Sequence, residues 1–322
     1  MNKIGIVLFN LGGPHSLDDI EEFLYNLFMD PYIINLPVHV SIRRILARIV
    51  ARRRARKTRF YYEVMGGKSP QYELTLKQAR ALENKLKPVV DVRTYVGMRY
   101  FKPTIEDAYR ALAKDDIERV VLLPLYPHYS RTTTLSSIQE WNRVTRDSFD
   151  RMKVLQIESY HNFPPYIDAV ATRISETLQR FPIDVRENVH ILFSAHGVPE
   201  SVVKKGDPYK SQIEETVKLV SEKFDNEYSL SYQSRVGPVK WLGPKTLNEI
   251  ERLASSGVKY LMVVPISFVN EHSETLYEIN FLFRQKAKMY GIDQFEMMPA
   301  LNDSPKFIDA LAQLVFEKIK EF

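Results

Sequence analysis

Residues 190–200 read HILFSAHGVPE, an apolar run that ends in a turn carrying His196 between Ala195 and Gly197. An apolar run of this length with turn residues behind it is typical of a buried β-strand. We expect this strand at 189–193 and His196 on a tight turn beyond it. Residues 6–14, which read IVLFNLGGP, repeat the pattern near the N-terminus. The repeat indicates that one strand-and-turn unit occurs twice in the chain.

Strands and helices alternate on either side of these two stretches. A second echo joins VVLLPLYPHYS at 120–130 to LMVVPISFVNEHS at 261–273. Alternation of this kind predicts parallel sheets covered by helices on both faces. We therefore predict an α/β fold of two similar doubly wound, Rossmann-like domains, 1–150 and 151–322. The active-site cleft is expected between them, because such sheets bind ligands at the carboxyl ends of their strands.

The individual elements follow from hydrophobic period and from capping and turn residues. The expected strands are 4–9, 89–96, 119–123, 152–157, 189–193, 228–234 and 260–264. The expected helices are 17–28, 71–87, 103–112, 135–144, 165–179, 211–224, 245–255, 273–290 and 304–320. The last helix is expected to pack back on the first half.

The composition excludes several kinds of site. The 322 residues contain no cysteine, so disulfides, thiolate metal sites, cysteine-ligated iron–sulfur clusters and thiol nucleophiles are excluded. The N-terminal apolar run is too short for a secretory signal, and no window approaches the roughly 18 apolar residues that span a bilayer. We expect a cytoplasmic protein without a transmembrane helix.

The net charge of +5 is concentrated in one segment, residues 31–62, called the basic segment below. It holds eight Arg, one Lys and no acid, whereas 36 basic and 40 acidic residues make up the rest. Within it, Ile42, Ile45, Leu46, Ile49 and Val50 recur at helical spacing, which predicts an amphipathic helix. The charge pattern suits an anionic membrane surface, a helix packed on its own core with a solvated face or, less well, nucleic acid.

A dinucleotide site, the default for this architecture, is not supported. The turns at 10–14 and 196–199 lack the GxGxxG spacing, and Pro14 removes a backbone N–H that a phosphate would need. The sequence has no GxxxxGK[ST] motif either.

His196 is the first candidate functional residue. A single histidine is more often a structural donor to a nearby carbonyl. Its place at a strand end, with Gly197 allowing close approach, favours a side chain that faces a ligand cavity.

A second candidate is NEHSETLYEI at 270–279. On an α-helix, Glu271, Glu274 and Glu278 form one acidic stripe, with His272 beside it. Such a stripe is either an exposed helix face or a site for protons or a divalent metal such as Fe(II) or Zn(II). A third group, of aromatic residues and arginine, suits a large flat apolar pocket with a cationic anchor. Its members are Arg99, Tyr100, Phe101, Tyr126, Tyr129 and Trp241.

The motifs that carry these residues resemble the ferrochelatase family, in its bacterial form without an iron–sulfur cluster. In chain order the matching stretches are NLGGP (10–14), GGKSP (66–70), GMRY (97–100), YPHYS (126–130), ILFSAHGVPE (191–200) continuing to Tyr209, YQSRVGP and WLGP (232–244), and EHSETLYE (271–278). The resemblance covers essentially the whole chain. One departure is Lys68, which stands where the family has the third glycine of GGGSP.

The resemblance implies an enzyme that inserts Fe(II) into protoporphyrin IX in the last step of haem synthesis. It implies His196 and Glu274 as the catalytic and metal-contacting pair, and Glu271, His272 and Glu278 as an adjoining path for metal or protons. It implies porphyrin contacts at Leu11, Ser69, Arg99, Tyr100, Tyr129 and Trp241. We expect His196 to act as the proton acceptor, because a tight protein ligand would hold iron back from the porphyrin.

Partners and alternatives follow from the same resemblance. We expect no tightly bound cofactor and no iron–sulfur cluster, peripheral contact with an anionic membrane through 31–62, no nucleic acid, and contact with the preceding haem-pathway enzyme. The alternatives are a chelatase for coproporphyrin III or for cobalt and, outside catalysis, a porphyrin or haem carrier.

Overall fold

The computed structural model describes residues 3–34, 38–146, 151–235 and 239–322. Residues 35–37 of the basic segment and 147–150 at the expected domain boundary lie outside the described residues. The chain divides into two compact units, and each is treated by itself. Unit 1 comprises Met1–Tyr126, Ser130–Ser159 and Leu311–Phe322, and unit 2 comprises Pro127–Tyr129 and Tyr160–Ala310. The cleft expected between the halves stays a prediction.

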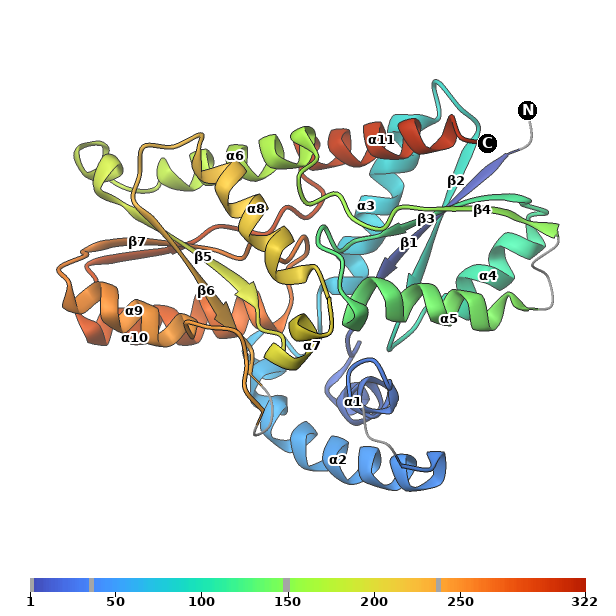
Figure 1. Cartoon of the computed structure of the whole chain (residues 1–322), viewed down its shortest axis with the longest axis horizontal. Coiled ribbons are helices and arrows are strands. Elements are labelled where there is room, and N and C mark those ends of the chain that lie inside the picture. Colours follow the sequence, from blue (N-terminus) through green and yellow to red (C-terminus); the bar gives the residue numbers. More distant parts are fainter. Residues whose placement is uncertain (1–2, 35–37, 147–150, 236–238) are drawn as a thin grey trace. The chain divides into compact units, whose positions relative to one another are not determined.

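Unit 1 is built on a parallel four-stranded sheet with the order β2-β1-β3-β4 (Figure 1). The strands are β1 (Ile4–Asn10), β2 (Val92–Met98), β3 (Arg119–Pro124) and β4 (Lys153–Gln156). All seven residues of the inner strand β1 are buried. A strand covered on both faces needs this continuous apolar run, which is why the sequence shows no alternation there.

Unit 2 repeats the topology, with a parallel sheet of order β6-β5-β7-β8. Its strands are β5 (His190–His196), β6 (Tyr228–Gln233), β7 (Tyr260–Val264) and β8 (Gln294–Met297). The predicted α/β fold with two similar doubly wound sheets is confirmed. Strand β8 was not predicted, because it is a four-residue edge strand with a half-buried, partly charged sequence.

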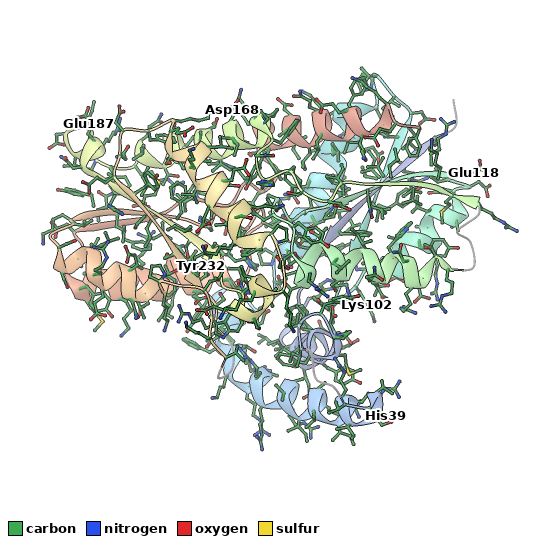
Figure 2. All side chains as sticks on the ribbon, viewed as in Figure 1. His39, Lys102, Glu118, Asp168, Glu187 and Tyr232 are labelled. Carbon is green, nitrogen blue, oxygen red and sulfur yellow. The ribbon has the colours of Figure 1, made fainter. Side chains whose placement is uncertain are left out.

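Helices cover both faces of each sheet, and side chains fill the layers between (Figures 1 and 2). In unit 2, Tyr232 of β6 is 2% exposed, as expected for a strand between two helix layers. The unit 1 helices are α1 (Ile20–Met29), α2 (Val40–Val64), α3 (Gln71–Leu86), α4 (Ile105–Lys114) and α5 (Ser136–Val144). The others are α6 (Pro164–Leu178), α7 (Glu200–Lys204), α8 (Tyr209–Ser221), α9 (Thr246–Ser255), α10 (Arg284–Tyr290) and α11 (Pro305–Ile319), and α11 runs from unit 2 into unit 1.

Helix α2 exposes the apolar stripe that the sequence predicts for it. Ala47, Ala51 and Tyr62 are its buried residues, and they pack in one cluster with residues of α1. The predicted stripe lies elsewhere on the helix: Ile45 is 62% exposed and Ile49 is 46% exposed. Small alanines allow the two helices to approach closely, so the larger side chains remain at the surface. Helix α2 therefore packs through its alanines and Tyr62, and it leaves the predicted stripe at the surface.

Gly5 of β1 tests how tightly the sheet of unit 1 packs against α4. A Cβ built on Gly5 would lie 2.3 Å from Cδ2 of Leu112, a fully buried residue of α4. We expect Gly5→Ala to lower the free energy of unfolding by about 1–3 kcal/mol through overpacking. We expect Leu112→Ala to lower it by about 2–5 kcal/mol by leaving a cavity.

The double variant should lose less than the sum of the two, because the new methyl group fills part of the space that Leu112 vacates. Urea unfolding of the three variants measures this coupling. Strict additivity would mean that the two positions do not share this space.

Candidate active site

His196 is the last residue of β5 rather than part of a turn beyond it. The expected strand end at Phe193 is wrong, because β5 stays paired with β6 as far as His196 and Gln233. The Gly197 N–H then donates to the Gln233 carbonyl oxygen at 2.8 Å, which prolongs the pairing. A Cβ on Gly197 would lie 2.7 Å from that oxygen. Glycine is therefore required here by close backbone approach.

The main chain of His196 is fixed from two further elements. Its N–H donates to Ser267 Oγ at 2.8 Å, and its carbonyl oxygen accepts from the Tyr209 hydroxyl at 2.9 Å. Tyr209 begins α8, and Ser267 follows β7. The imidazole thus starts from a backbone that has little freedom to move, as a preorganised catalytic group requires.

The acidic residues come from a π-helix, η5 (Ser273–Phe283), which continues into α10. The sequence predicts one α-helix over 273–290. A π-helix bonds residue i to i+5, so its turns are wider and Glu274 and Glu278 lie on one side. Gln233 Nε2 contacts both, donating to the Glu274 carbonyl oxygen at 3.0 Å and to Glu278 Oε2 at 3.2 Å.

Glu274 forms a hydrogen-bonded ion pair with His196, with Nδ1 and Oε2 2.8 Å apart. Burial alone would lower the pKa of His196, but the Glu274 carboxylate outweighs burial and raises it. Burial would likewise raise the pKa of Glu274, but the charge of His196 lowers it to about 2. Within the described part of the chain, Nε2 of His196 has no hydrogen-bond partner. Glu274 therefore hydrogen-bonds to Nδ1 of His196 and leaves Nε2 available to react.

Glu278 and His272 lie beside this pair, and burial shifts their pKa values in opposite directions. Burial, and then the charge of Glu274, raise the pKa of Glu278, while the Ser234 hydroxyl donates to its Oε2 at 2.7 Å. Burial lowers the pKa of His272, whose Nε2 lies 3.8 Å from Glu274 Oε2. The site therefore combines a charged pair with two groups whose neutral forms are favoured by burial.

Glu271 does not join the predicted acidic stripe. It lies before η5, is 9% exposed, and accepts from the Ala300 N–H at 2.8 Å and from the Thr275 hydroxyl. Burial raises its pKa. The expectation of three acids on one helix face is wrong, because the helix begins after Glu271 and the carboxylate bonds to other partners.

The expected porphyrin contacts divide between the two units. Unit 1 holds Leu11 after β1, the buried Ser69 before α3, Arg99 and Tyr100. Unit 2 holds Tyr129, whose N–H donates to Gln212 Oε1 at 2.6 Å, and Trp241, which pairs with Pro199. Trp241 lies beside the end of β5, since its Cε3 is 3.4 Å from the Cβ position of Gly197.

Arg99 and Tyr100 are held by a buried carboxylate that the sequence analysis missed, Asp30 at the end of α1. Arg99 Nη2 lies 3.0 Å from Asp30 Oδ2, and the Tyr100 hydroxyl donates to the same oxygen at 2.7 Å. The Ser136 hydroxyl, at the start of α5, donates to it as well. Tyr100 is only 2% exposed, so its ring belongs to this packed network.

Two further residues of the site were also missed, Gln233 and Ser234. Both lie in the stretch YQSRVGP, where only the family resemblance drew attention. Ser234 has φ +63°, a left-handed conformation that is rare for serine, and its Oγ reaches Glu278 from there. Strained backbone of this kind is common at functional sites. In the ranges that the structure describes, no three His, Asp or Glu side chains gather in a way that could hold a metal ion.

Comparison with known proteins gives a consistent result. Residues 3–319 match the sequence model of the family described as ferrochelatase. Ferrochelatase of Aquifex aeolicus is 49% identical over 319 residues, 98% of this chain and 100% of that protein. Ferrochelatase of a Synechocystis strain is 43% identical and aligns with 100% of this chain and 84% of its own length.

Solved structures show the same fold at low sequence identity. SirB from Bacillus subtilis with Fe³⁺ has a TM-score of 0.60 at 14% identity, over 98% of this chain and 95% of its own. The sirohydrochlorin chelatase SirB from Bacillus subtilis subspecies spizizenii in complex with cobalt has a TM-score of 0.57 at 11% identity, over 99% and 96%.

The Asp30 network yields a stability prediction. Asp30→Ala leaves the Arg99 guanidinium and the Tyr100 hydroxyl without their buried acceptor, so the free energy of unfolding should fall by about 3–5 kcal/mol. Urea unfolding measures the loss. The control is Glu106→Gln, which breaks a surface pair with Arg110 and should cost no more than about 0.5 kcal/mol. Equal losses in the two variants would show that the Asp30 network does not stabilise unit 1.

Proposed function

This chain belongs to the ferrochelatase family, and on that premise we propose that it inserts Fe(II) into protoporphyrin IX at the His196–Glu274 pair, forming protohaem. It is an enzyme of haem synthesis whose substrates are iron and a porphyrin. The observation that supports this site is the 2.8 Å contact between His196 Nδ1 and Glu274 Oε2 at the carboxyl end of β5. The alternatives of a cobalt chelatase, a coproporphyrin III chelatase and a carrier are not favoured, since the relatives are named ferrochelatase.

The reaction needs a proton acceptor. A neutral porphyrin carries two pyrrole N–H protons and must release both as the Fe(II) ion binds its four nitrogens. Nε2 of His196 takes one of them, and Glu274 stabilises the imidazolium that forms by holding Nδ1–H. A metal–nitrogen bond replaces each N–H bond, and no electrons are transferred.

Glu278 is our candidate for the next step of the proton path. Its raised pKa favours the protonated form, and Ser234 and Gln233 hold its Oε2 by hydrogen bonds. His272 Nε2 lies 3.8 Å from Glu274 Oε2 and can serve metal or proton transfer. Glu271 has its own partners, Ala300 and Thr275, so we place it outside this path.

Porphyrin binding through Leu11, Ser69, Arg99, Tyr100, Tyr129 and Trp241 remains a proposal. Of these, Arg99 keeps 16% of its side chain exposed and is positioned by Asp30, which suits a cationic anchor for an acidic substrate group. We propose that no cofactor is tightly bound, because Fe(II) is the substrate and this sequence has no cysteine for a cluster.

We also propose that α2 contacts an anionic membrane from the cytoplasmic side. None of the helices within the described residues is long and apolar enough to cross a membrane. The support for surface contact is the exposed stripe of α2 together with the arginines of the basic segment. Contact with nucleic acid is not proposed, and contact with the preceding haem-pathway enzyme stays a prediction.

His196→Ala should reduce iron insertion into detergent-solubilised protoporphyrin IX to the uncatalysed rate in a protein that still folds, as far-ultraviolet circular dichroism would show. The reason is that Nε2 is the only acceptor we assign to the first pyrrole proton. The control is His190→Gln, at the opposite end of β5, which should retain activity. Substantial activity in His196→Ala would assign the proton acceptor elsewhere.

Glu274→Gln should move the pH dependence of kcat/KM. The neutral form of His196 is the active base, so activity rises as pH passes upward through its raised pKa, above 6.5. Removing the carboxylate leaves burial dominant, the pKa of His196 falls, and the acidic limb shifts to lower pH. The plateau should drop by about 10²-fold or more, since the imidazolium loses its counter-ion.

Glu215→Gln, an exposed partner of His161 in the same unit, is the control and should leave the limb in place. A limb that moves to higher pH in Glu274→Gln, or does not move, would contradict the assigned pair.

Membrane contact should weaken when the α2 stripe is made polar. Each isoleucine buried in the interface contributes about 1.5–3 kcal/mol, so Ile45→Ser should reduce the affinity for vesicles of anionic lipid by about tenfold or more. Sedimentation with vesicles measures it. Ile183→Ser, which is 81% exposed in unit 2, should have no effect. If Ile45→Ser binds the vesicles as strongly as the parent does, α2 does not contact the membrane.

A further inference from the structure

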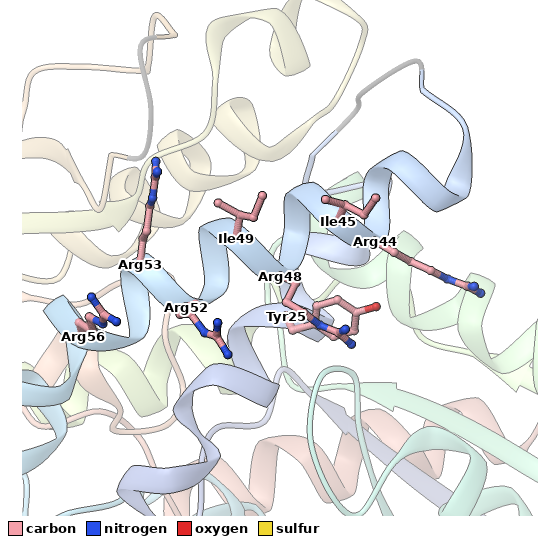
Figure 3. Close-up of a pocket in the computed structure, with 8 residues that line it drawn as sticks. All are labelled: Tyr25, Arg44, Ile45, Arg48, Ile49, Arg52, Arg53 and Arg56. Atoms are coloured by element: carbon pink, nitrogen blue, oxygen red, sulfur yellow. The ribbon is translucent and has the colours of Figure 1, made fainter.

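A cavity of about 510 Å³ lies against α2 and α1, and none of the residues that line it belongs to the candidate active site. Figure 3 shows these lining residues. Tyr25 of α1 lines it together with seven residues of α2. Those seven are Arg44, Ile45, Arg48, Ile49, Arg52, Arg53 and Arg56. Its lining thus contains five cations, two large apolar side chains and no acid.

The arginines are arranged as a ladder along one helix. Arg44, Arg48, Arg52 and Arg56 recur every four residues, so they project from one side of α2 about 6 Å apart. Like charges at this spacing destabilise an isolated helix. We therefore expect an anion from outside the helix to compensate these charges.

The partners of the α2 arginines differ between the cavity and the rest of the helix. Away from the cavity, Arg43 donates to the Ile34 carbonyl oxygen, and Arg59 pairs with Asp18 and Glu63. In the cavity, Arg52 has a weak exposed contact with Glu21 at 3.7 Å, and Arg48 lies over the ring of Tyr25.

The remaining three cavity arginines, Arg44, Arg53 and Arg56, have no carboxylate within 4.0 Å in the ranges that the structure describes. The positive charge of the cavity is therefore largely uncompensated by the protein.

The apolar side chains identify the kind of anion. Ile45 and Ile49 line the same cavity as the arginines and are 62% and 46% exposed. A free phosphate would satisfy the guanidinium groups but leave both isoleucines in water. An amphiphile with a phosphate group and hydrocarbon chains covers both kinds of surface. Arginine suits the phosphate in particular, because its planar guanidinium can donate two parallel hydrogen bonds.

We propose that this cavity is a specific binding site for a phospholipid headgroup, with the phosphate among Arg44, Arg48 and Arg52 and the acyl chains over Ile45 and Ile49. The ladder from Arg44 to Arg56 extends about 18 Å along the helix, so it reaches further than one phosphate. The site favours a headgroup that carries more than one phosphate. This inference rests on the proposed membrane contact of α2 and names the ligand and the site within it.

The test compares two double variants of the full chain that lose the same charge from the same helix. Arg44→Gln with Arg48→Gln alters the cavity, and Lys57→Gln with Arg59→Gln alters exposed positions outside it. Binding is measured by co-sedimentation with phosphatidylcholine vesicles containing either phosphatidylserine or phosphatidylinositol 4-phosphate at equal total charge. If the protein binds only by diffuse attraction to a charged surface, both variants should lose the same affinity for the vesicles. If the cavity is a specific site, only the first variant should lose much affinity.

We expect the parent to prefer vesicles with phosphatidylinositol 4-phosphate, and the cavity variant to lose about tenfold more affinity for them than the control. Iron insertion into detergent-solubilised protoporphyrin IX should be unchanged in both, which also shows that they fold. Equal losses in the two variants would overturn the site while leaving membrane contact in place.

Two other outcomes would also count against the site. Absence of parent binding to any vesicle would overturn membrane contact and the site together, while iron insertion would still test the enzymatic function separately. A second arm adds sodium pyrophosphate at constant ionic strength. If pyrophosphate competes for the protein as strongly as the lipid headgroup does, the cavity is a site for free phosphates and the lipid proposal is wrong.

Discussion

The contact between His196 Nδ1 and Glu274 Oε2, at 2.8 Å, depends on several parts of unit 2 at once. β5 must remain paired with β6 as far as His196, which requires a glycine at 197. η5 must open with a π-helical turn so that Glu274 and Glu278 both reach Gln233. A pair of opposite charges, each partly removed from water, tolerates little displacement, because losing either partner leaves the other uncompensated.

The same topology supports different chemistry in the two units. At the end of β1, the counterpart of β5, stands the neutral Asn10, whose amide bonds to Thr75 and Gln71. At the end of β5 stands an imidazole paired with a carboxylate. A neutral amide network can be buried at low cost, whereas an ionisable pair is useful only where a substrate can reach it. The duplicated fold thus has a neutral amide network at one strand end and an ionisable pair at the other.

Helix α2 shows how stability and interaction compete for one surface. Its alanines pack on α1, and its isoleucines and most of its arginines face outward. An exposed row of large apolar side chains costs solubility and contributes little to folding, so it is expected only where another surface covers it. The pairing of Arg43 and Arg59 within the protein, with Arg44, Arg53 and Arg56 left to the cavity, follows the same division.

The sequence by itself determined the α/β alternation, the two matching halves, the amphipathic character of α2 and the candidate pair His196 and Glu274, because period and motif are local properties. It placed Glu271 wrongly, missed β8, and did not reveal Asp30, Gln233 or Ser234. The tertiary structure decided these points. Whether a carboxylate faces His196 or Ala300, and whether an isoleucine is covered or exposed, depends on contacts between segments far apart in the chain, which no local pattern encodes.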